Sequence, residues 1–164
     1  MITACELAGF FAAHAIWSVS DGGALVPILA YTTGDDERKM ERLAQDDVAE
    51  AVASGKDRLT SNEMDAIDGV LLFDGRISFD DEDELDAIII EIRTYFSLDS
   101  EAVLAVPYSP ASESGDFRVH KPKLVEWKDC DDFDLETAMD AFFKGVDSHD
   151  EGSKVWSEAL DESK

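Results

Sequence analysis

The sequence has few cysteines and no apolar run as long as a membrane span. Its two cysteines, Cys5 and Cys130, lie far apart, unlike the dense cysteines of small secreted scaffolds, and we interpret both as free thiols. The apolar stretch Leu7–Val19 is interrupted by His14 and falls short of the ~20 residues of a transmembrane helix. No Lys or Arg precedes that stretch, as a secretory signal would require. We therefore expect a cytoplasmic protein that does not bind membranes.

Basic residues are scarce too, since 14 Lys and Arg stand against 38 Asp and Glu, for a formal net charge of −24. Such a charge repels the phosphates of nucleic acids and anionic lipids. It accelerates encounter with basic partners, within a Debye length of ~8 Å at physiological salt. Two explanations without a partner also apply: many acidic surfaces are simply exposed to solvent, and an acidic surface can be an adaptation to a salty cytoplasm. The charge argues against nucleic acid and favours a basic protein as the partner.

Catalytic and cofactor fingerprints are missing as well. The sequence has no phosphate-binding loop, no dinucleotide glycine pattern, no Gly-x-Ser-x-Gly elbow and no paired-histidine zinc motif. His14, His120 and His149 show no ligand spacing, so we expect no metal centre and no cofactor. We expect His14 to be a hydrogen-bonded core residue, because it lies on an apolar helix face, and His149 to be a solvated loop residue.

The residues that are present follow the pattern of an α+β fold. The 164 residues and the apolar content of 45% suit one compact domain over residues 1–164. The first helix is apolar on most sides, and such a helix is normally enclosed by its own domain or by a second copy in a homodimer. Helices are predicted by capping residues before apolar residues at helical spacing, at 3–19 with a capping box at Thr3 and Glu6, at 47–61 after Asp46 or Asp47, after Asp134, and from Ser153.

Strands between these helices predict a mainly antiparallel sheet of about five or six strands. The clearest signal is Asp74-Gly75 between two short apolar runs, which predicts a type I′ turn joining strands at 70–73 and 76–79. The long run at 87–96 predicts a central strand. Further strands are predicted at 24–33, 38–43, 102–108 and 117–127, the last with a bulge at Pro122.

One constellation resembles an enzyme site. Asp74, with Glu91 and Arg93 on the central strand, resembles the acidic residue and Glu-x-Lys pattern of restriction-endonuclease-like folds. That resemblance implies a metal-dependent hydrolase or nuclease in which two carboxylates bind Mg²⁺ and a cation stabilises the phosphate. Arg93 stands where the pattern has lysine, and the net charge opposes a nucleic-acid substrate. Cross-strand salt bridging explains Glu91 and Arg93 with fewer assumptions, so we keep this enzyme as the alternative.

Two charged segments are the candidate partner-binding residues. The acidic run lacks the glycine and the spacing of a calcium loop. The basic strip reverses the local charge and includes an aromatic side chain suited to a protein interface. It can pair with acidic segments of the same chain or face a partner. The candidates are Asp80, Asp81, Glu82, Asp83 and Glu84 in the acidic run, and Arg118, Lys121, Lys123 and Trp127 in the basic strip, with Lys128 beside them.

The sequence favours a non-enzymatic acidic protein that binds a basic protein partner, because a preformed negative surface steers such an encounter. Inhibitors, immunity-type proteins and secretion chaperones offer an analogy of size and charge alone. A metal-dependent hydrolase and a structural homodimer of unknown role stay open as alternatives.

Overall fold

The structure of the protein is a computed structural model that describes residues 2–44, 46–78, 84–95, 100–111, 115–128 and 134–161. The described residues form four helices and seven strands, which confirms the predicted α+β fold. The helices are α1 (Ile2–Val19), α2 (Val48–Ser61), α3 (Leu135–Asp147) and α4 (Asp150–Ala159). The strands are β1 (Ile28–Thr32), β2 (Arg38–Arg42), β3 (Asp68–Ile77), β4 (Leu85–Thr94), β5 (Ser100–Ser109), β6 (Arg118–Val119) and β7 (Lys123–Lys128).

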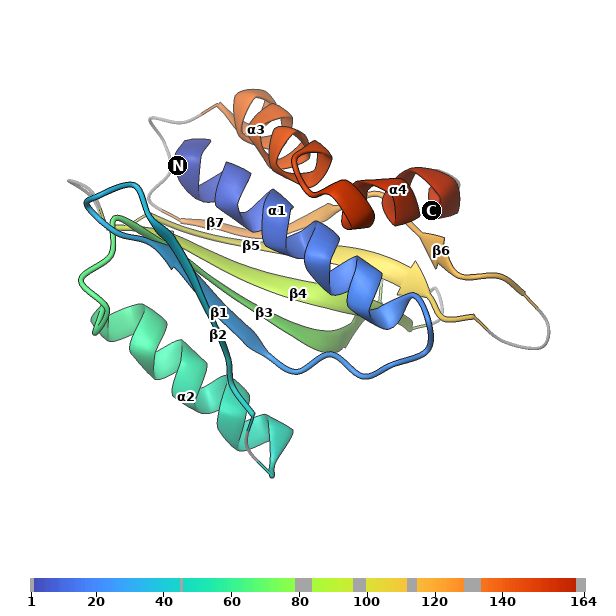
Figure 1. The fold of residues 1–164 in the computed structure, drawn as a ribbon, viewed down its shortest axis with the longest axis horizontal. Helices are drawn as coiled ribbons and strands as arrows, with labels where there is room; N and C mark the ends of the chain where they lie inside the picture. Colours follow the sequence, from blue (N-terminus) through green and yellow to red (C-terminus); the bar gives the residue numbers. More distant parts are fainter. Residues whose placement is uncertain are drawn as a thin grey trace.

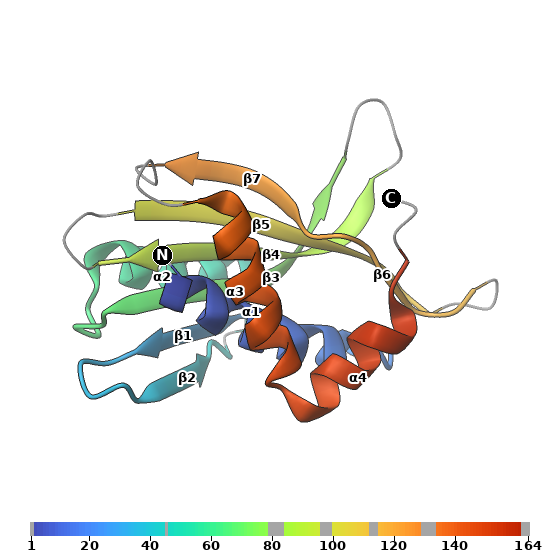
Figure 2. The ribbon, with the colours of Figure 1, turned by 90° about the horizontal axis from the view of Figure 1, so that it is seen from above.

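The strands pair antiparallel in one sheet with the order β2-β1-β3-β4-β5-β6, and β7 pairs with β5 beside β6 (Figure 2). The strand predicted at 117–127 is thus divided into β6 and β7, and the break includes Pro122, which cannot donate to a ladder. β4 lies inside the sheet, as predicted. β2 forms one edge, and all of its residues are exposed.

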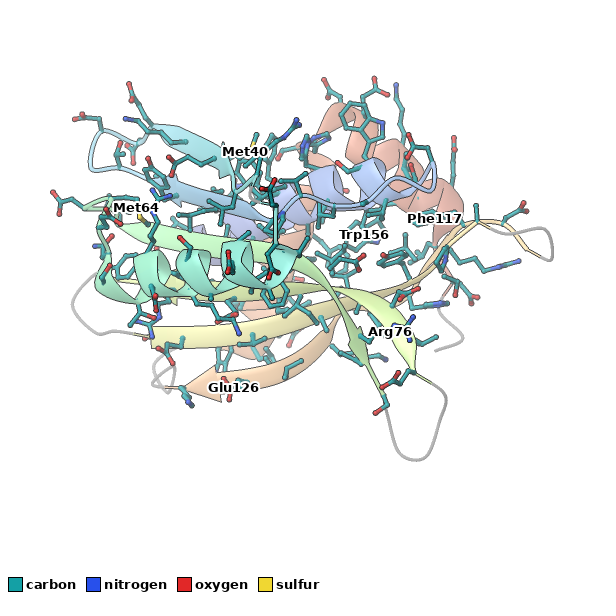
Figure 3. All side chains as sticks on the ribbon, turned by 90° about the horizontal axis from the view of Figure 1, so that it is seen from below. Met40, Met64, Arg76, Phe117, Glu126 and Trp156 are labelled. Carbon is teal, nitrogen blue, oxygen red and sulfur yellow. The ribbon has the colours of Figure 1, made fainter. Side chains whose placement is uncertain are left out.

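Helices cover both faces of the sheet, with α1, α3 and α4 on one face and α2 on the other (Figure 1). Because side chains alternate along a strand, the even-numbered residues of β3, β4 and β5 point toward α1, where Val70 and Ile90 belong to the larger core. Odd-numbered residues point toward α2, where Leu71 packs in a smaller core with Leu59. Figure 3 shows this second face, with Met64 beyond the end of α2.

Glycines let α1 approach α3 and α4 closely. A Cβ atom added at Gly9 would collide with the backbone of Phe142, and one added at Gly152 would lie 2.5 Å from the carbonyl oxygen of Ala13. By length and composition α1 could also cross a membrane, but most of it is buried within this fold, as in the core helix of a soluble protein. The chain itself therefore covers α1, and a homodimer contact through this helix stays a prediction.

The predicted hairpin turn at Asp74-Gly75 is wrong. β3 continues through both residues to Ile77, and Asp74 and Gly75 lie opposite Ile88 and Ala87 of β4. Asp-Gly is only a local turn signal, whereas the pairing of β3 with β4 along its whole length fixes an extended backbone. The connection between β3 and β4 falls after Ile77 instead.

Two of the predicted helix caps are confirmed and one is wrong. Asp47 caps α2 and Asp134 caps α3, each by accepting the backbone N–H two residues further on, at 2.8 Å and 3.2 Å. Thr3 does not cap α1, because it lies within the helix and its hydroxyl donates to Asp68 of β3. A long-range hydrogen bond has replaced the local one that the capping box predicts.

The predicted start of the last helix at Ser153 is also wrong. α4 begins at Asp150, and His149 caps it by accepting the Gly152 N–H on Nδ1 at 2.9 Å. Histidine is not among the preferred capping residues, so the sequence gives little warning of this helix start.

Candidate functional site

A row of polar side chains crosses one end of the sheet. Thr32 of β1 lies opposite Arg38 of β2 on one side and Asp68 of β3 on the other. The row continues to Thr94 of β4 and Ser100 of β5. Directly opposite residues in an antiparallel ladder point to the same face, so these five side chains all face the α1 side. Asp68, Thr94 and Ser100 are buried, and the row therefore replaces the apolar core at this end of the sheet.

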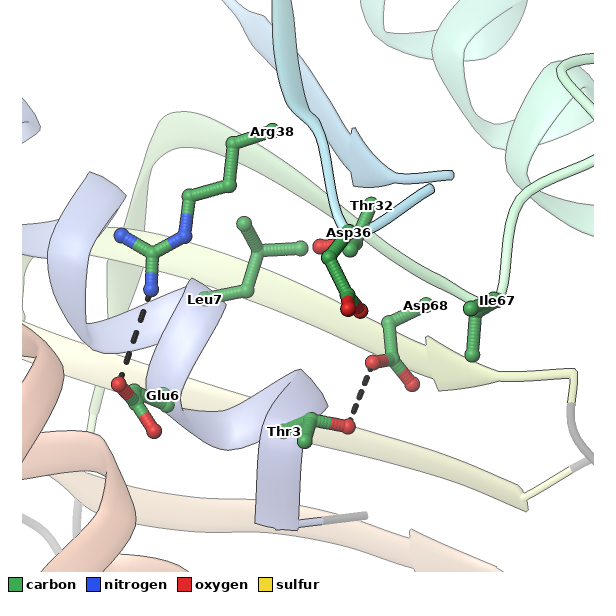
Figure 4. A pocket seen from close by; sticks show the side chains of 8 residues that line it. All are labelled: Thr3, Glu6, Leu7, Thr32, Asp36, Arg38, Ile67 and Asp68. Carbon is green, nitrogen blue, oxygen red and sulfur yellow. Dashed lines mark hydrogen bonds and ion pairs between the residues drawn. The ribbon is translucent and has the colours of Figure 1, made fainter. Parts of the chain in front are cut away.

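The first turn of α1 lies over this row and encloses a pocket. The Thr3 hydroxyl donates to Asp68 Oδ2 at 2.6 Å, which fixes the start of the helix to the end of β3. The pocket has a volume of about 380 Å³ and is lined by Thr3, Glu6, Leu7, Thr32, Asp36, Arg38, Ile67 and Asp68 (Figure 4). We call it the α1 pocket.

Acidic groups outnumber basic ones in the α1 pocket. Among the described residues that line it, Arg38 is the one cation, against the carboxylates of Glu6, Asp36 and Asp68. The Arg38 guanidinium lies 3.7 Å from Glu6 Oε1 and stacks 5.0 Å from the centre of the Phe10 ring. Glu6 is thus paired twice, with Arg38 at Oε1 and with Lys144 of α3, whose Nζ lies 3.8 Å from Oε2. Asp36 and Asp68 are left as the excess negative charge, and Figure 4 shows both carboxylates facing the pocket.

Asp68 is the least satisfied group of the site. Its side chain is only 1% exposed. Oδ2 accepts the Thr3 hydroxyl, but Oδ1 has no hydrogen-bond partner among the described residues. Of the four buried polar atoms without a partner there, this is the one that belongs to a carboxylate. An unpaired buried carboxylate oxygen destabilises a fold unless something supplies the missing donor, so the α1 pocket is suited to receive a cationic group.

The residues of the predicted hydrolase site lie on opposite faces of the sheet. Asp74 faces α1, accepts the Tyr108 hydroxyl at 2.9 Å, and has a pKa raised by burial. Glu91 faces α2, with Lys56 Nζ 3.4 Å from its Oε2. Arg93, also on the α2 face, forms an ion pair with Glu101 of β5, directly opposite it in the ladder. The sheet separates Asp74 from Glu91, so the shared Mg²⁺ site implied by the resemblance is wrong.

The acidic run lies almost wholly outside the described residues. Asp80, Asp81, Glu82 and Asp83 are not described, and the structure does not test them as partner-binding residues. Glu84 is described, and its Oε2 lies 3.6 Å from Nη1 of Arg76. Glu84 therefore pairs with Arg76 of β3 and not with a residue of the basic strip.

The basic strip lies along β6, β7 and the residues between them. Arg118 Nη1 lies 3.7 Å from Asp161 Oδ2, and Lys128 Nζ lies 4.0 Å from Glu126 Oε1. Trp127 is half-buried against the larger core. Lys121 and Lys123 are on the same stretch but not in the α1 pocket. At least part of the strip is therefore paired within the chain, and the structure does not bring it together with the α1 pocket.

Two histidines meet where α4 begins against α1. His14 Nδ1 lies 3.3 Å from His149 Nε2. His149 Nδ1 already accepts the Gly152 N–H, so neutral His149 carries its proton on Nε2 and donates it to His14. The proton of His14 is then on Nε2, which is buried without a partner in the described part of the chain. Burial, followed by the charges of His149 and Arg42, lowers the pKa of His14.

This contact confirms one histidine prediction in part and corrects the other. His14 is hydrogen-bonded, as expected, but it is half-buried and not part of the larger core. His149 is not a solvated loop residue, because it caps α4 and packs against the rings of Phe10 and Trp17. Because His149 caps α4 through Nδ1, its Nε2 carries the proton and donates it to His14 Nδ1.

Sequence reasoning missed the central residues of the α1 pocket. It selected Thr3 and Glu6, but for a helix cap rather than for a pocket. Asp68 stands at the start of a strongly apolar strand, and an acidic residue in that place is the one signal that could have drawn attention to it. Thr32 and Asp36 carry no distinguishing pattern.

Known proteins do not identify the site. No protein-family model, curated protein or solved structure matches this chain.

Proposed function

We propose that this protein is a non-enzymatic acidic binding protein of the cytoplasm that recognises a basic protein partner, with the α1 pocket as the anchoring site. The observation that carries the proposal is the buried Asp68 carboxylate, whose Oδ1 has no partner in the described residues of a pocket with excess negative charge. A cationic side chain from another protein would supply the missing partner, in a charge-assisted hydrogen bond of the stronger kind.

The charge of the whole chain supports the same proposal. If all 14 Lys and Arg residues paired with separate carboxylates, 38 − 14 = 24 acidic groups would still have no cationic mate within the chain. Such an excess produces a negative field around the molecule, which draws basic proteins toward it and sets the rate of encounter. The field acts on approach, and the pocket acts once the partner is in contact.

A protein bound to a basic surface also blocks that surface. Inhibition, immunity and chaperone action would each use this physical contact, and they differ only in what the blocked surface does. The α1 pocket therefore supports a binding function without choosing among these three roles.

The test uses a displayed peptide library selected on the immobilised chain, followed by calorimetric titration of the synthesised hits at low and at high salt. We expect the selected peptides to contain Lys or Arg residues and to bind more weakly at high salt. In Asp68→Asn their affinity should fall by about 30-fold or more, since losing one partner of a buried charge pair costs ~2 kcal/mol or more.

Asp57→Asn is the matched control, because it removes the same charge from an exposed residue of α2, on the opposite face of the sheet. It should change the affinity by less than about threefold, as expected for a screened surface charge. Peptides without basic residues, or hits that bind Asp68→Asn as tightly as the wild type, would refute the proposed function.

A further inference from the structure

We infer that the α1 pocket selects the primary ammonium group of a lysine side chain over the guanidinium group of an arginine, and that Thr3 sets this choice. The inference rests on the proposed function only for the source of the lysine. The preference itself is a property of the pocket, and small amines can probe it.

The argument begins with the two oxygens of Asp68. Oδ2 accepts the Thr3 hydroxyl at 2.6 Å, whereas Oδ1 has no partner in the described part of the chain. A guanidinium group binds a carboxylate best as a planar fork that engages both oxygens at once. An ammonium group is a compact point charge and is satisfied by one oxygen. Thr3 takes one of the two acceptor positions of Oδ2. A guanidinium fork must therefore share that oxygen with the hydroxyl, whereas an ammonium group needs Oδ1 alone, and this favours the ammonium.

The other polar groups of the pocket fit the same ligand. An ammonium group has three donors. The pocket is lined by Asp68, whose Oδ1 is buried without a partner in the described residues, by the carboxylate of Asp36, and by Thr3, whose oxygen keeps its lone pairs while it donates its proton. Arg38 is turned toward Glu6 and Phe10, so the guanidinium that the pocket already contains pairs with a carboxylate other than Asp68.

The apolar lining suits the stem of a lysine. Leu7 and Ile67 line the pocket beside its polar groups. Lysine side chains bury their methylene groups along apolar surfaces while the ammonium reaches polar partners. A hard divalent cation gains nothing from such a lining and takes six or more oxygen ligands. In the described ranges, no group of three or more His, Cys, Asp or Glu side chains is arranged to hold a metal ion.

The experiment compares n-butylammonium with n-propylguanidinium, which reproduce the ends of lysine and arginine side chains. Each is titrated into the isotope-labelled full chain while the amide signals of Thr3 and Asp68 are followed by NMR. We expect the wild type to bind n-butylammonium about tenfold more tightly than n-propylguanidinium, or better, which is the effect of one charge-assisted hydrogen bond. Asp68→Asn should lose the binding of both compounds.

Thr3→Val tests the role of the hydroxyl, because it keeps the shape of the side chain and frees Asp68 Oδ2. The preference for n-butylammonium should fall to about one or invert, since the guanidinium fork can now use both oxygens. Thr3→Ser restores the hydroxyl and should restore the wild-type ratio. Thr3→Ala also removes the hydroxyl and provides the same test if the valine variant does not fold.

Several results would overturn the inference. They are equal binding of the two compounds by the wild type, no binding of n-butylammonium, an unchanged ratio in Thr3→Val and Thr3→Ala, or displacement of n-butylammonium by Mg²⁺ at lower concentration. These failures are distinct from failure of the proposed function. Basic peptides that depend on Asp68 without ammonium selectivity would leave that function standing. Ammonium selectivity without any basic peptide hits would leave a small-amine site and refute the binding of a basic protein.

Discussion

The close contact between α4 and α1 predicts that Gly152→Ala destabilises the fold. A Cβ at this position would lie 2.5 Å from the carbonyl oxygen and 2.8 Å from the Cβ of Ala13. Ordinary contact begins at 3.4 Å, so the shortfall at the carbonyl oxygen is 3.4 − 2.5 = 0.9 Å. The obstacle is helix backbone, which cannot rotate out of the way, and the two helices must therefore separate.

The size of the effect follows from two opposed contributions. Overpacking of a well-packed core costs about 1–3 kcal/mol, and the same glycine-to-alanine change inside a helix returns at most about 1 kcal/mol. Because the obstacle is backbone, the overpacking cost falls in the upper part of that range, about 2–3 kcal/mol. We therefore expect Gly152→Ala to lower the free energy of unfolding by about 1–2 kcal/mol, which corresponds to a fall in Tm of roughly 2–8 °C for a chain of this size. Separation of α4 from α1 should also lengthen the contact between His14 and His149.

Urea unfolding at neutral pH, followed by circular dichroism, measures this change. Gly34→Ala is the control, since a Cβ at Gly34 would meet nothing within 4 Å, and it should change the stability by less than about 0.5 kcal/mol. If Gly152→Ala is as stable as Gly34→Ala, with an unchanged slope of unfolding against urea, the close approach of the two helices is not as described and the reasoning is refuted.

Two further predictions concern pH. The pKa of His14 is lowered from 6.5 by burial, so below pH 6.5 the unfolded chain binds more protons and stability falls as the pH falls. Urea midpoints should decrease more steeply toward acid in the wild type than in His14→Gln, and equal slopes would contradict this. The pKa of Asp74 is raised from 3.8, chiefly by burial, so the folded chain binds more protons above pH 3.8 and stability falls as the pH rises through that range. Asp74→Asn keeps an acceptor for Tyr108 without the charge and should raise the urea midpoint at pH 7, with the gain shrinking as the pH approaches 3.8; a lower midpoint at pH 7 would contradict it.

Features with local causes could be predicted from the sequence. Asp47 and Asp134 mark helix starts because the capping hydrogen bond spans only two residues. The strand at β4 is recognisable because it contains a run of apolar residues from Ala87 to Ile92 that only Glu91 interrupts. The α+β class follows from the order of such elements, because the sequence of each segment is enough to predict its own helix or strand.

The failures come from contacts between distant segments. Asp74-Gly75 has the composition of a turn, but the ladder with β4 holds it extended. Thr3 is a residue type that often caps helices, but its hydroxyl donates a hydrogen bond to Asp68, 65 residues away. The α1 pocket depends on the register of β1, β2 and β3, and a shift of one residue would turn the polar side chains of a strand to the opposite face. No single segment carries that information.

The exposed edge strand β2 affects how strongly the protein associates with other molecules at high protein concentration. Four of its five residues are charged and of both signs, in the order Arg38, Lys39, Met40, Glu41 and Arg42. A strand from a neighbouring molecule that paired here would have to bring its own side chains against these charges, which discourages fibrous association. Arg38 also lines the α1 pocket, so a molecule that binds in this pocket would lie beside the charged side chains of β2.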